Sequence, residues 1–179
     1  MDKRLNDAIE YIRSCDIQPQ DGLPENLFLM ISGLVPLVNV DLLVTNSRGQ
    51  LLLSRRNDRF FEKSWHIPGG CLRYGDSFAK RITETAEREL RAKVSFDEQP
   101  LAVRNVWRGA NASQEHPNER GQNIAILFAC RLPEDYQIEN FGKQEDEDGY
   151  LKWFDTLPVD FMKIQHVYDD CLKKWRIEG

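Results

Sequence analysis

The stretch that decides the fold is PGGCLRYGDSFAKRITETAERE, residues Pro68–Glu89. Its paired glycines, Gly69 and Gly70, predict a tight turn in which a backbone carbonyl can approach a ligand closely. A short acidic loop and a carboxylate-bearing helix follow directly. Because Mg²⁺ prefers oxygen ligands and retains water, a carbonyl, a carboxylate and substrate phosphates would suffice to hold it. The stretch can therefore hold a divalent cation against a diphosphate.

The run from Ser77 to Arg91 is the strongest helix prediction in the chain. Ser77 or Asp76 can cap its first turn. Three glutamates lie on this helix, and the third, Glu89, falls on a different strip of its surface from the other two. Taken alone, a helix with solvated charges is the simpler interpretation of this pattern. One face of the helix carries the apolar residues Phe78, Ile82, Ala86 and Leu90.

The rest of the chain mixes strand and helix patterns without regular β-α alternation, which favours an α+β fold or an α/β/α sandwich over a doubly wound sheet. Two polar loops interrupt the pattern, 109–121 and 143–149, and the first is too long for a simple connector. The expected elements are an N-terminal helix ending near Ser14, an apolar stretch at 27–34 compatible with a helix, a β-hairpin of Pro36–Val44 and Gln50–Ser54, strands near 65–68, 101–108, 123–131 and 150–154, and a helix after Pro158.

Length and composition limit the classes of function. A chain of 179 residues fits one domain, and its net charge of −5 argues against a nucleic-acid or anionic-membrane binder. No apolar run approaches the roughly 20 residues that span a bilayer, and the N-terminus does not resemble a signal peptide. The four cysteines are far apart and form no C-x-x-C pair, so free thiols in a reducing cytoplasm are expected.

Counted from Gly70, the segment resembles the Nudix hydrolase signature, G-x5-E-x7-R-E-U-x-E-E-x-G-U, in a degenerate form. A glycine, one acidic position and one glutamate of the signature survive. These are Gly70, Asp76 in place of the first Glu, and Glu89; the departures are Glu84-Thr85 for Arg-Glu, Arg88 for the first Glu of the second pair, and Arg91 for the last Gly.

A similarly degenerate box is found in the GDP-mannose mannosyl hydrolase branch of that family, and the resemblance extends beyond the box. The segment PLVNVDLLVTNSRGQLLLSRRNDRFFEKSWHIPGG, residues 36–70, is similar to that branch without a gap. The resemblance runs from about Glu25 to the C-terminal helix. It implies an α+β, Nudix-type α/β/α sandwich with a mixed central sheet and an added N-terminal helix. The expected division is an extension over 1–24 and a Nudix domain over 25–179.

The resemblance also implies a metal site. In the branch, one Mg²⁺ is held by a glycine carbonyl, a helical glutamate and a residue of a late loop, and Gly69 and Glu89 match the first two. Counting back six residues from Trp153 gives Glu147 as the third ligand, whereas a Gln-x-Asp register would give Gln144. Glu147 is preferred because the tryptophan is fixed by a strand. Mn²⁺ is an alternative metal.

Two further residues match positions that contact the substrate and the departing diphosphate in the branch, Asp41 and Arg56. The branch has a histidine as general base beside the late metal ligand, and here that position is Asp148. An arginine that follows the glycines in the branch is replaced by Cys71. His116, in the long polar loop, is an alternative base. For Arg56, a solvated surface position is as good an interpretation as a functional one.

The resemblance therefore implies a Mg²⁺-dependent hydrolase that cleaves a GDP-sugar, such as GDP-mannose, at the anomeric carbon and releases GDP and free sugar. One alternative is a Nudix pyrophosphatase that cleaves the P–O–P link of a nucleoside diphosphate derivative. Another is a catalytically silent module that binds a nucleotide. The expected partners are a nucleoside diphosphate sugar and a second copy of the chain in a homodimer, with no nucleic acid and no membrane.

Overall fold

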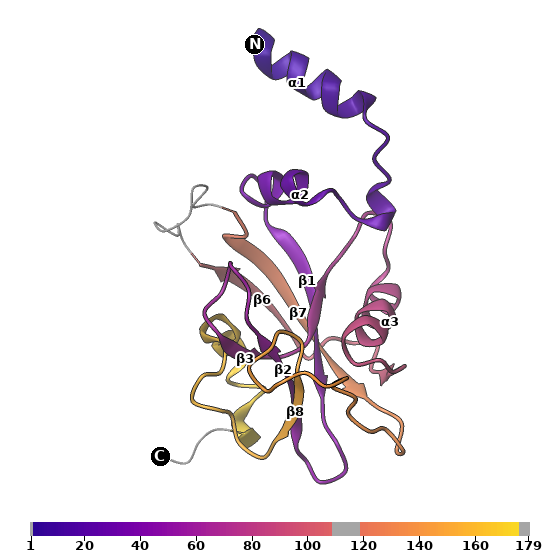
Figure 1. Cartoon of the computed structure of the whole chain (residues 1–179), viewed down its shortest axis with the longest axis vertical. Helices are drawn as coiled ribbons and strands as arrows, with labels where there is room; N and C mark the ends of the chain where they lie inside the picture. Colours follow the sequence, from indigo (N-terminus) through magenta and orange to yellow (C-terminus); the bar gives the residue numbers. More distant parts are fainter. Residues whose placement is uncertain (1, 109–118, 176–179) are drawn as a thin grey trace.

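The computed structural model describes residues 2–108 and 119–175, so His116 lies outside the described residues. Two β-sheets form the centre of the molecule, with a long helix against one side and short 3₁₀ turns against the other (Figure 1). The helices are α1 Lys3–Ser14, η1 Pro19–Asp21, α2 Glu25–Ser32, α3 Phe78–Glu89, η2 Lys163–Tyr168 and η3 Lys173–Trp175. The strands are β1 Leu37–Val44, β2 Leu51–Arg56, β3 Ser64–His66, β4 Gly69–Cys71, β5 Ser95–Phe96, β6 Ala102–Trp107, β7 Gln122–Arg131 and β8 Leu151–Phe154.

Strand β1 organises the first sheet. It pairs in parallel with β7 and antiparallel with β4, and β7 also pairs with β5 and β6. The second sheet has the order β3-β2-β8 with antiparallel pairing. The mixed sheet expected from the sequence is therefore confirmed. Antiparallel pairing of β1 with β4 places Asp41 directly opposite Gly69.

The predicted hairpin of β1 and β2 is wrong. The turn itself forms, because the Asn46 side-chain oxygen accepts hydrogen bonds of 3.0 Å from the backbone N–H groups of Arg48 and Gln50. Beyond it, the two strands share only an isolated bridge between Thr45 and Leu51 and then enter different sheets. All three leucines of β2 are fully buried, so both faces of that strand are covered by core. A turn signal fixes the reversal of the chain, but burial decides how far the strands stay paired.

Helix α3 covers one face of the first sheet. Ser77 is its N-cap, since its hydroxyl accepts a 3.1 Å hydrogen bond from the backbone N–H of Lys80. The apolar face predicted from the sequence packs as expected, except that Phe78 is partly exposed. Alternate residues of β1 meet this face, because side chains of a strand point to opposite sides in turn. The cluster contains Val40, Leu42, Val44, Ile82, Ala86 and Leu90.

The C-terminal segment differs from the predicted helix, because it forms the short 3₁₀ turns η2 and η3. Its apolar residues are nevertheless buried against the second face of the sheets, among them Phe161, Tyr168 and Leu172. Tertiary hydrogen bonds compete with a regular helix here. The Gln165 side chain accepts from the backbone N–H of Ile67 at 2.7 Å and donates to the Ile67 carbonyl at 3.2 Å.

The N-terminal helix α1 forms where the sequence predicts it, and the mixed stretch at 27–34 is helical in α2. Asp2 caps α1 by accepting a hydrogen bond from the backbone N–H of Arg4 at 2.9 Å. No residue of α1 is buried, and Figure 1 shows it standing away from the sheets. Within residues 2–108 and 119–175, no helix combines the length and apolar character needed to cross a membrane.

Candidate active site

The two glycines belong to strand β4, so the predicted tight turn at this point is wrong. Neither has a positive φ angle, and the requirement for glycine is spatial. A Cβ atom on Gly69 would lie 2.3 Å from the Asp41 Oδ1 atom and 2.8 Å from the Val40 carbonyl oxygen. One on Gly70 would lie 2.4 Å from the Thr85 hydroxyl oxygen of α3. The glycines therefore let β4 lie close to both β1 and α3.

This close packing brings the C-terminal end of α3 to the Gly69 backbone. The Gly69 N–H donates to Glu89 Oε2 at 3.3 Å. The Arg88 guanidinium donates both to the Gly69 carbonyl, at 3.3 Å, and to Glu89 Oε1, at 2.8 Å. Burial raises the pKa of Glu89, and the hydrogen bond from Arg88 opposes that shift. The carbonyl and the carboxylate thus share one cation.

This arrangement fits a divalent metal. The Arg88 guanidinium shows that the Gly69 carbonyl and the Glu89 carboxylate converge on a single cationic group. Both atoms are the oxygen donors that Mg²⁺ and Mn²⁺ accept, and Mg²⁺ needs few protein ligands when it also binds substrate phosphates. Within the described ranges 2–108 and 119–175, no cluster of three or more His, Cys, Asp or Glu side chains could hold a metal by itself. Substrate oxygens and water would have to complete the coordination.

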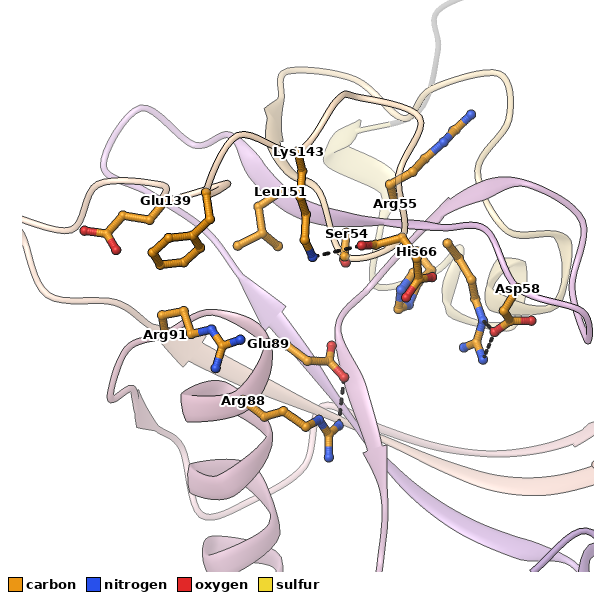
Figure 2. A pocket seen from close by; sticks show the side chains of 14 residues that line it. Ser54, Arg55, Asp58, His66, Arg88, Glu89, Arg91, Glu139, Lys143 and Leu151 are labelled. Atoms are coloured by element: carbon orange, nitrogen blue, oxygen red, sulfur yellow. Dashed lines mark hydrogen bonds and ion pairs between the residues drawn. The ribbon is translucent and has the colours of Figure 1, made fainter. Parts of the chain in front are cut away.

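A cavity of about 290 Å³ lies beside this pair and is called the metal-side cavity below. Figure 2 shows Glu89 at the end of α3 below the wall that carries Ser54 and His66, with the Arg88 guanidinium beneath its carboxylate, while Arg55 points away. The walls therefore come from α3 on one side and from strands β2 and β3 on the other. Asp148, from the loop before β8, also lines it.

A second cavity, of about 90 Å³, is lined by both glycines and is called the sheet cavity. Asp41 lines it and is only 7% exposed. The Tyr168 hydroxyl donates to Asp41 Oδ2 at 2.7 Å. Burial raises the pKa of Asp41 to about 7; the Tyr168 hydrogen bond opposes this shift, and the Glu89 charge adds to it. The buried Asp41 carboxylate thus has a hydrogen-bond partner, as burial of such a group requires.

Arg56 lines both cavities. Its Nε atom donates to Asp58 Oδ2 at 2.7 Å, and its guanidinium carbon lies 4.1 Å from the centre of the Phe61 ring. These two contacts hold the side chain in place, which distinguishes it from a solvated surface arginine. A guanidinium presented between two cavities is suited to bind phosphate oxygens.

The late loop places its two candidate residues differently. Asp148 Oδ1 accepts a hydrogen bond from the backbone N–H of Asn57 at 3.0 Å, which fixes the loop against the end of β2. Glu147 turns back onto its own loop, where its Oε2 atom accepts from the Gln144 N–H at 2.9 Å. Neither Glu147 nor Gln144 lines the metal-side cavity. The assignment of Glu147 as a metal ligand stays a prediction.

His66 is a candidate that no motif of the sequence indicates. It lines both cavities. Burial, together with the nearby Arg56 charge, lowers the pKa of His66 to about 4. Because its Nδ1 atom lies 2.9 Å from the Ile67 carbonyl, a neutral ring donates from Nδ1 and keeps Nε2 as an acceptor. Strand alternation could have found it, since the buried Trp65 faces the core and His66 must face the opposite side.

The acidic position 76 of the box has a structural role. Both the Asp76 side chain, 0% exposed, and that of Arg81, 1% exposed, are buried and form an ion pair. Asp76 also accepts from the backbone N–H of Arg73 at 2.9 Å and pairs with Lys80 at 3.0 Å. Burial raises the pKa of Asp76, but these hydrogen bonds and charges outweigh it and hold the pKa at about 2. Glu84 is engaged as well, because it pairs with Arg81 at 2.9 Å. Of the glutamates of α3, Glu89 is the one that lines the metal-side cavity.

Comparison with known proteins identifies the family. A family profile described as NUDIX domain matches residues 35–169. The chain belongs to the Nudix family. The α+β Nudix fold expected from the sequence is thereby confirmed, and the chain is a Nudix hydrolase by family, a group that generally uses a divalent metal such as Mg²⁺.

Solved structures with the Nudix fold resemble this chain at low sequence identity. A UDP-X diphosphatase is 20% identical, with 98% of this chain and 70% of that chain covered and a TM-score of 0.53. A MutT protein from Methanosarcina mazei Go1 is 21% identical, with 78% and 97% covered and a TM-score of 0.51. An ADP-ribose pyrophosphatase from Streptococcus suis is 16% identical, with 81% and 96% covered and a TM-score of 0.50. At these identities the likeness shows the fold alone, and none of the three singles out the GDP-mannose branch.

Proposed function

We propose that this Nudix protein is a Mg²⁺-dependent hydrolase of a nucleoside diphosphate derivative, with a GDP-sugar such as GDP-mannose as substrate. The reaction would break the bond at the anomeric carbon and release GDP and free sugar. The observation that carries the proposal is the convergence of the Gly69 carbonyl and the Glu89 carboxylate on one cation, beside a cavity that Arg56 also lines. A nucleoside diphosphate brings the phosphate oxygens that this incomplete ligand set needs.

The bound metal would supply charge neutralisation for the departing diphosphate. Gly69 and Glu89 would hold it, and Glu147 is kept as the predicted third ligand, which requires its loop to turn toward the cavity. Arg56 would bind a phosphate oxygen and neutralise charge that builds up as the diphosphate leaves. Asp41 contributes a buried carboxyl group beside the glycines, where it would accept a hydrogen bond from a sugar hydroxyl.

Asp148 would act as the general base. It lines the metal-side cavity, and its Oδ1 atom is oriented by the Asn57 N–H, so the second oxygen is available to take a proton from water. The attacking water would then reach the anomeric carbon from the side opposite the departing diphosphate. The neutral His66 on the same wall offers Nε2 as a second proton acceptor.

Cleavage at carbon is favoured over cleavage at phosphorus by the number of carboxylates at the site. Attack at phosphorus with several metals needs several carboxylates, and two acidic groups of the box are engaged elsewhere, Asp76 with Arg81 and Glu84 with Arg81 and Lys80. The alternative is pyrophosphatase activity, which the names of the UDP-X diphosphatase and ADP-ribose pyrophosphatase relatives suggest. The homodimer, the cytoplasmic location and the division into 1–24 and 25–179 stay predictions.

Hydrolysis of GDP-mannose in H₂¹⁸O with Mg²⁺ distinguishes cleavage at the anomeric carbon from cleavage of the P–O–P link. Cleavage at the anomeric carbon places ¹⁸O in the mannose, whereas cleavage of the P–O–P link places it in a phosphate, where it shifts the ³¹P resonance. The proposal predicts label in mannose and GDP without label. Label in GMP or in mannose 1-phosphate would replace the proposal by the pyrophosphatase alternative. No turnover of GDP-sugars or other nucleoside diphosphate derivatives would favour the silent binding module.

A further inference from the structure

Three guanidinium groups gather around one phenyl ring at the mouth of the sheet cavity. The guanidinium carbons of Arg56 and Arg108 each lie 4.1 Å from the centre of the Phe61 ring, and that of Arg120 lies 5.6 Å from it. Asp58 is the carboxylate paired with this group, and it bonds to Arg56. Within residues 2–108 and 119–175, the one salt bridge of this group is that of Arg56 with Asp58, so positive charge is in excess here although the net charge of the chain is −5. The excess is local, and such an excess attracts anions.

Arg120 is held in position from two sides. Its backbone has a φ angle of 54°, an uncommon conformation for a residue other than glycine, and its N–H donates to the buried Ser32 hydroxyl at 2.8 Å. Its guanidinium lies among aromatic rings, 5.1 Å from the Phe60 centre and 5.8 Å from the Phe28 centre. An uncommon backbone conformation held by a part-buried hydrogen bond directs this side chain to a defined place.

The Arg120 guanidinium is withdrawn from water beside other positive charges. Burial lowers the pKa of Arg120, the Arg56 charge lowers it further, and Asp58 opposes the shift. Within residues 2–108 and 119–175, no carboxylate forms a salt bridge with Arg120 or with Arg108, whose guanidinium donates instead to the Phe60 carbonyl at 2.7 Å. A cation that is largely removed from water without a counter-charge is costly. A bound anion would remove that cost.

The surroundings of Arg120 point to where the anion would lie. Arg120 and Arg56 line the sheet cavity together with Gly69 and Cys71. Asn123 lines it too, only 7% exposed, and its side-chain oxygen has no hydrogen-bond partner within the described part of the chain. A second polar group is thus buried without a partner beside the unpaired arginine, which is the pattern expected of a site that binds a polar ligand.

We propose that Arg120 is a second diphosphate-binding residue, which holds the phosphate oxygens together with Arg56 from the side of the sheet cavity. Arg108 does not line the sheet cavity; it donates to the Phe60 carbonyl and stacks on the Phe61 ring. The inference rests on the proposed function for the identity of the anion. It adds a substrate-binding residue that no motif of the sequence indicates, since Arg120 follows a polar loop rather than the Nudix box.

Binding of GDP and of guanosine, measured by calorimetry with EDTA present, tests the proposal without turnover. A hydrogen bond to a charged group contributes about 1.5–3 kcal/mol, so Arg120→Gln should weaken GDP binding by about 10- to 100-fold. Guanosine, which lacks phosphate, should bind equally to both proteins. Arg59→Gln is the matched control, because Arg59 is exposed, pairs with Glu25 and also stacks on Phe60, but does not line the cavity.

Moving the charge within the cavity separates anion binding from a packing role. Cys71→Arg in the Arg120→Gln background returns a guanidinium to the same cavity and should recover most of the lost GDP affinity, while Arg120→Lys should recover part of it. Equal loss of GDP and guanosine affinity, unchanged GDP affinity in Arg120→Gln, or no GDP binding by the unaltered protein would each overturn the proposal. If GDP affinity depends on Arg120 but no GDP-sugar is hydrolysed, the hydrolase proposal fails and this inference stands.

Discussion

Replacement of Arg81 by methionine probes the buried ion pair that connects the acidic loop to α3. The change removes the guanidinium that pairs with Asp76 and leaves a carboxylate with 0% exposure at the start of the helix. A methionine of similar length preserves much of the packing of the 1% exposed arginine stem. The loss of stability therefore reports mainly the unpaired Asp76 charge, with a smaller share from the 38% exposed Glu84 that also pairs with Arg81, rather than a cavity.

The magnitude follows from the partners that remain. Breaking a buried pair by removal of one member costs about 3–5 kcal/mol. Lys80, 3.0 Å from Asp76, and the Arg73 N–H at 2.9 Å would still compensate part of the charge, so about 3 kcal/mol is expected. Asp76→Asn combined with Arg81→Met removes both charges. The double variant should therefore be more stable than the sum of the two single losses predicts.

Urea unfolding at pH 7, followed by circular dichroism, measures these free energies, and the kcat of the folded variants gives the second readout. Because Asp76 and Arg81 lie outside both cavities, folded Arg81→Met should keep kcat within about threefold, a small effect by the scale of 1.4 kcal/mol per tenfold. A loss of stability below about 1 kcal/mol, the range of exposed pairs, or strict additivity in the double variant would refute the reasoning.

Three further outcomes are expected. Arg88→Met should tighten Mn²⁺ binding at least about tenfold in calorimetry, because the metal must otherwise displace the Arg88 guanidinium from its place between the Gly69 carbonyl and Glu89. Arg91→Met is the control, since Arg91 lines the same cavity. As the pH is lowered from 6.5 to about 4, the unfolded state protonates His66 while the folded state keeps it neutral. The free energy of unfolding should therefore decrease by on the order of 3 kcal/mol over this range. His66→Gln should lose that part of the pH dependence of urea unfolding. Gly69→Ala should lower kcat/KM by at least about 100-fold, as expected when a metal-binding carbonyl is displaced, because its Cβ would lie 2.8 Å from the Val40 carbonyl. Weaker Mn²⁺ binding in Arg88→Met, the same pH profile in His66→Gln, or normal turnover by Gly69→Ala would contradict these expectations.

Local signals in the sequence were enough for the elements that carry the site. The Ser77 cap and the apolar spacing of α3 predict that helix within a few residues, and the apolar run before Val44 predicts β1. Local signals did not predict which strands pair with each other. The turn at Asn46 is local and was predicted, but the separation of β1 and β2 into two sheets depends on burial of both faces of β2. The resemblance to the Nudix family supplied the fold that local patterns left open.

The candidate site was only partly predictable for a related reason. Gly69, Glu89 and Arg56 match family positions, Asp148 stands where the branch has a histidine, and the fold brings all four to the cavities. His66 and Arg120 belong to no motif, and their burial and charge environment exist only in the folded chain. The structural role of Asp76 was not predictable either, because its ion pair with the buried Arg81 forms only in the folded chain.

Glu89 is proposed to hold a metal at which a nucleoside diphosphate derivative is hydrolysed. The most direct measurement is GDP release from GDP-mannose during a Mg²⁺ titration, with Glu89→Gln compared with Glu87→Gln, an exposed glutamate of the same helix. Loss of a metal ligand should lower turnover at least about 100-fold in Glu89→Gln and raise the Mg²⁺ concentration needed for half-maximal rate, while Glu87→Gln should match the unaltered protein. Mg²⁺-dependent turnover that is the same in all three proteins would contradict the account.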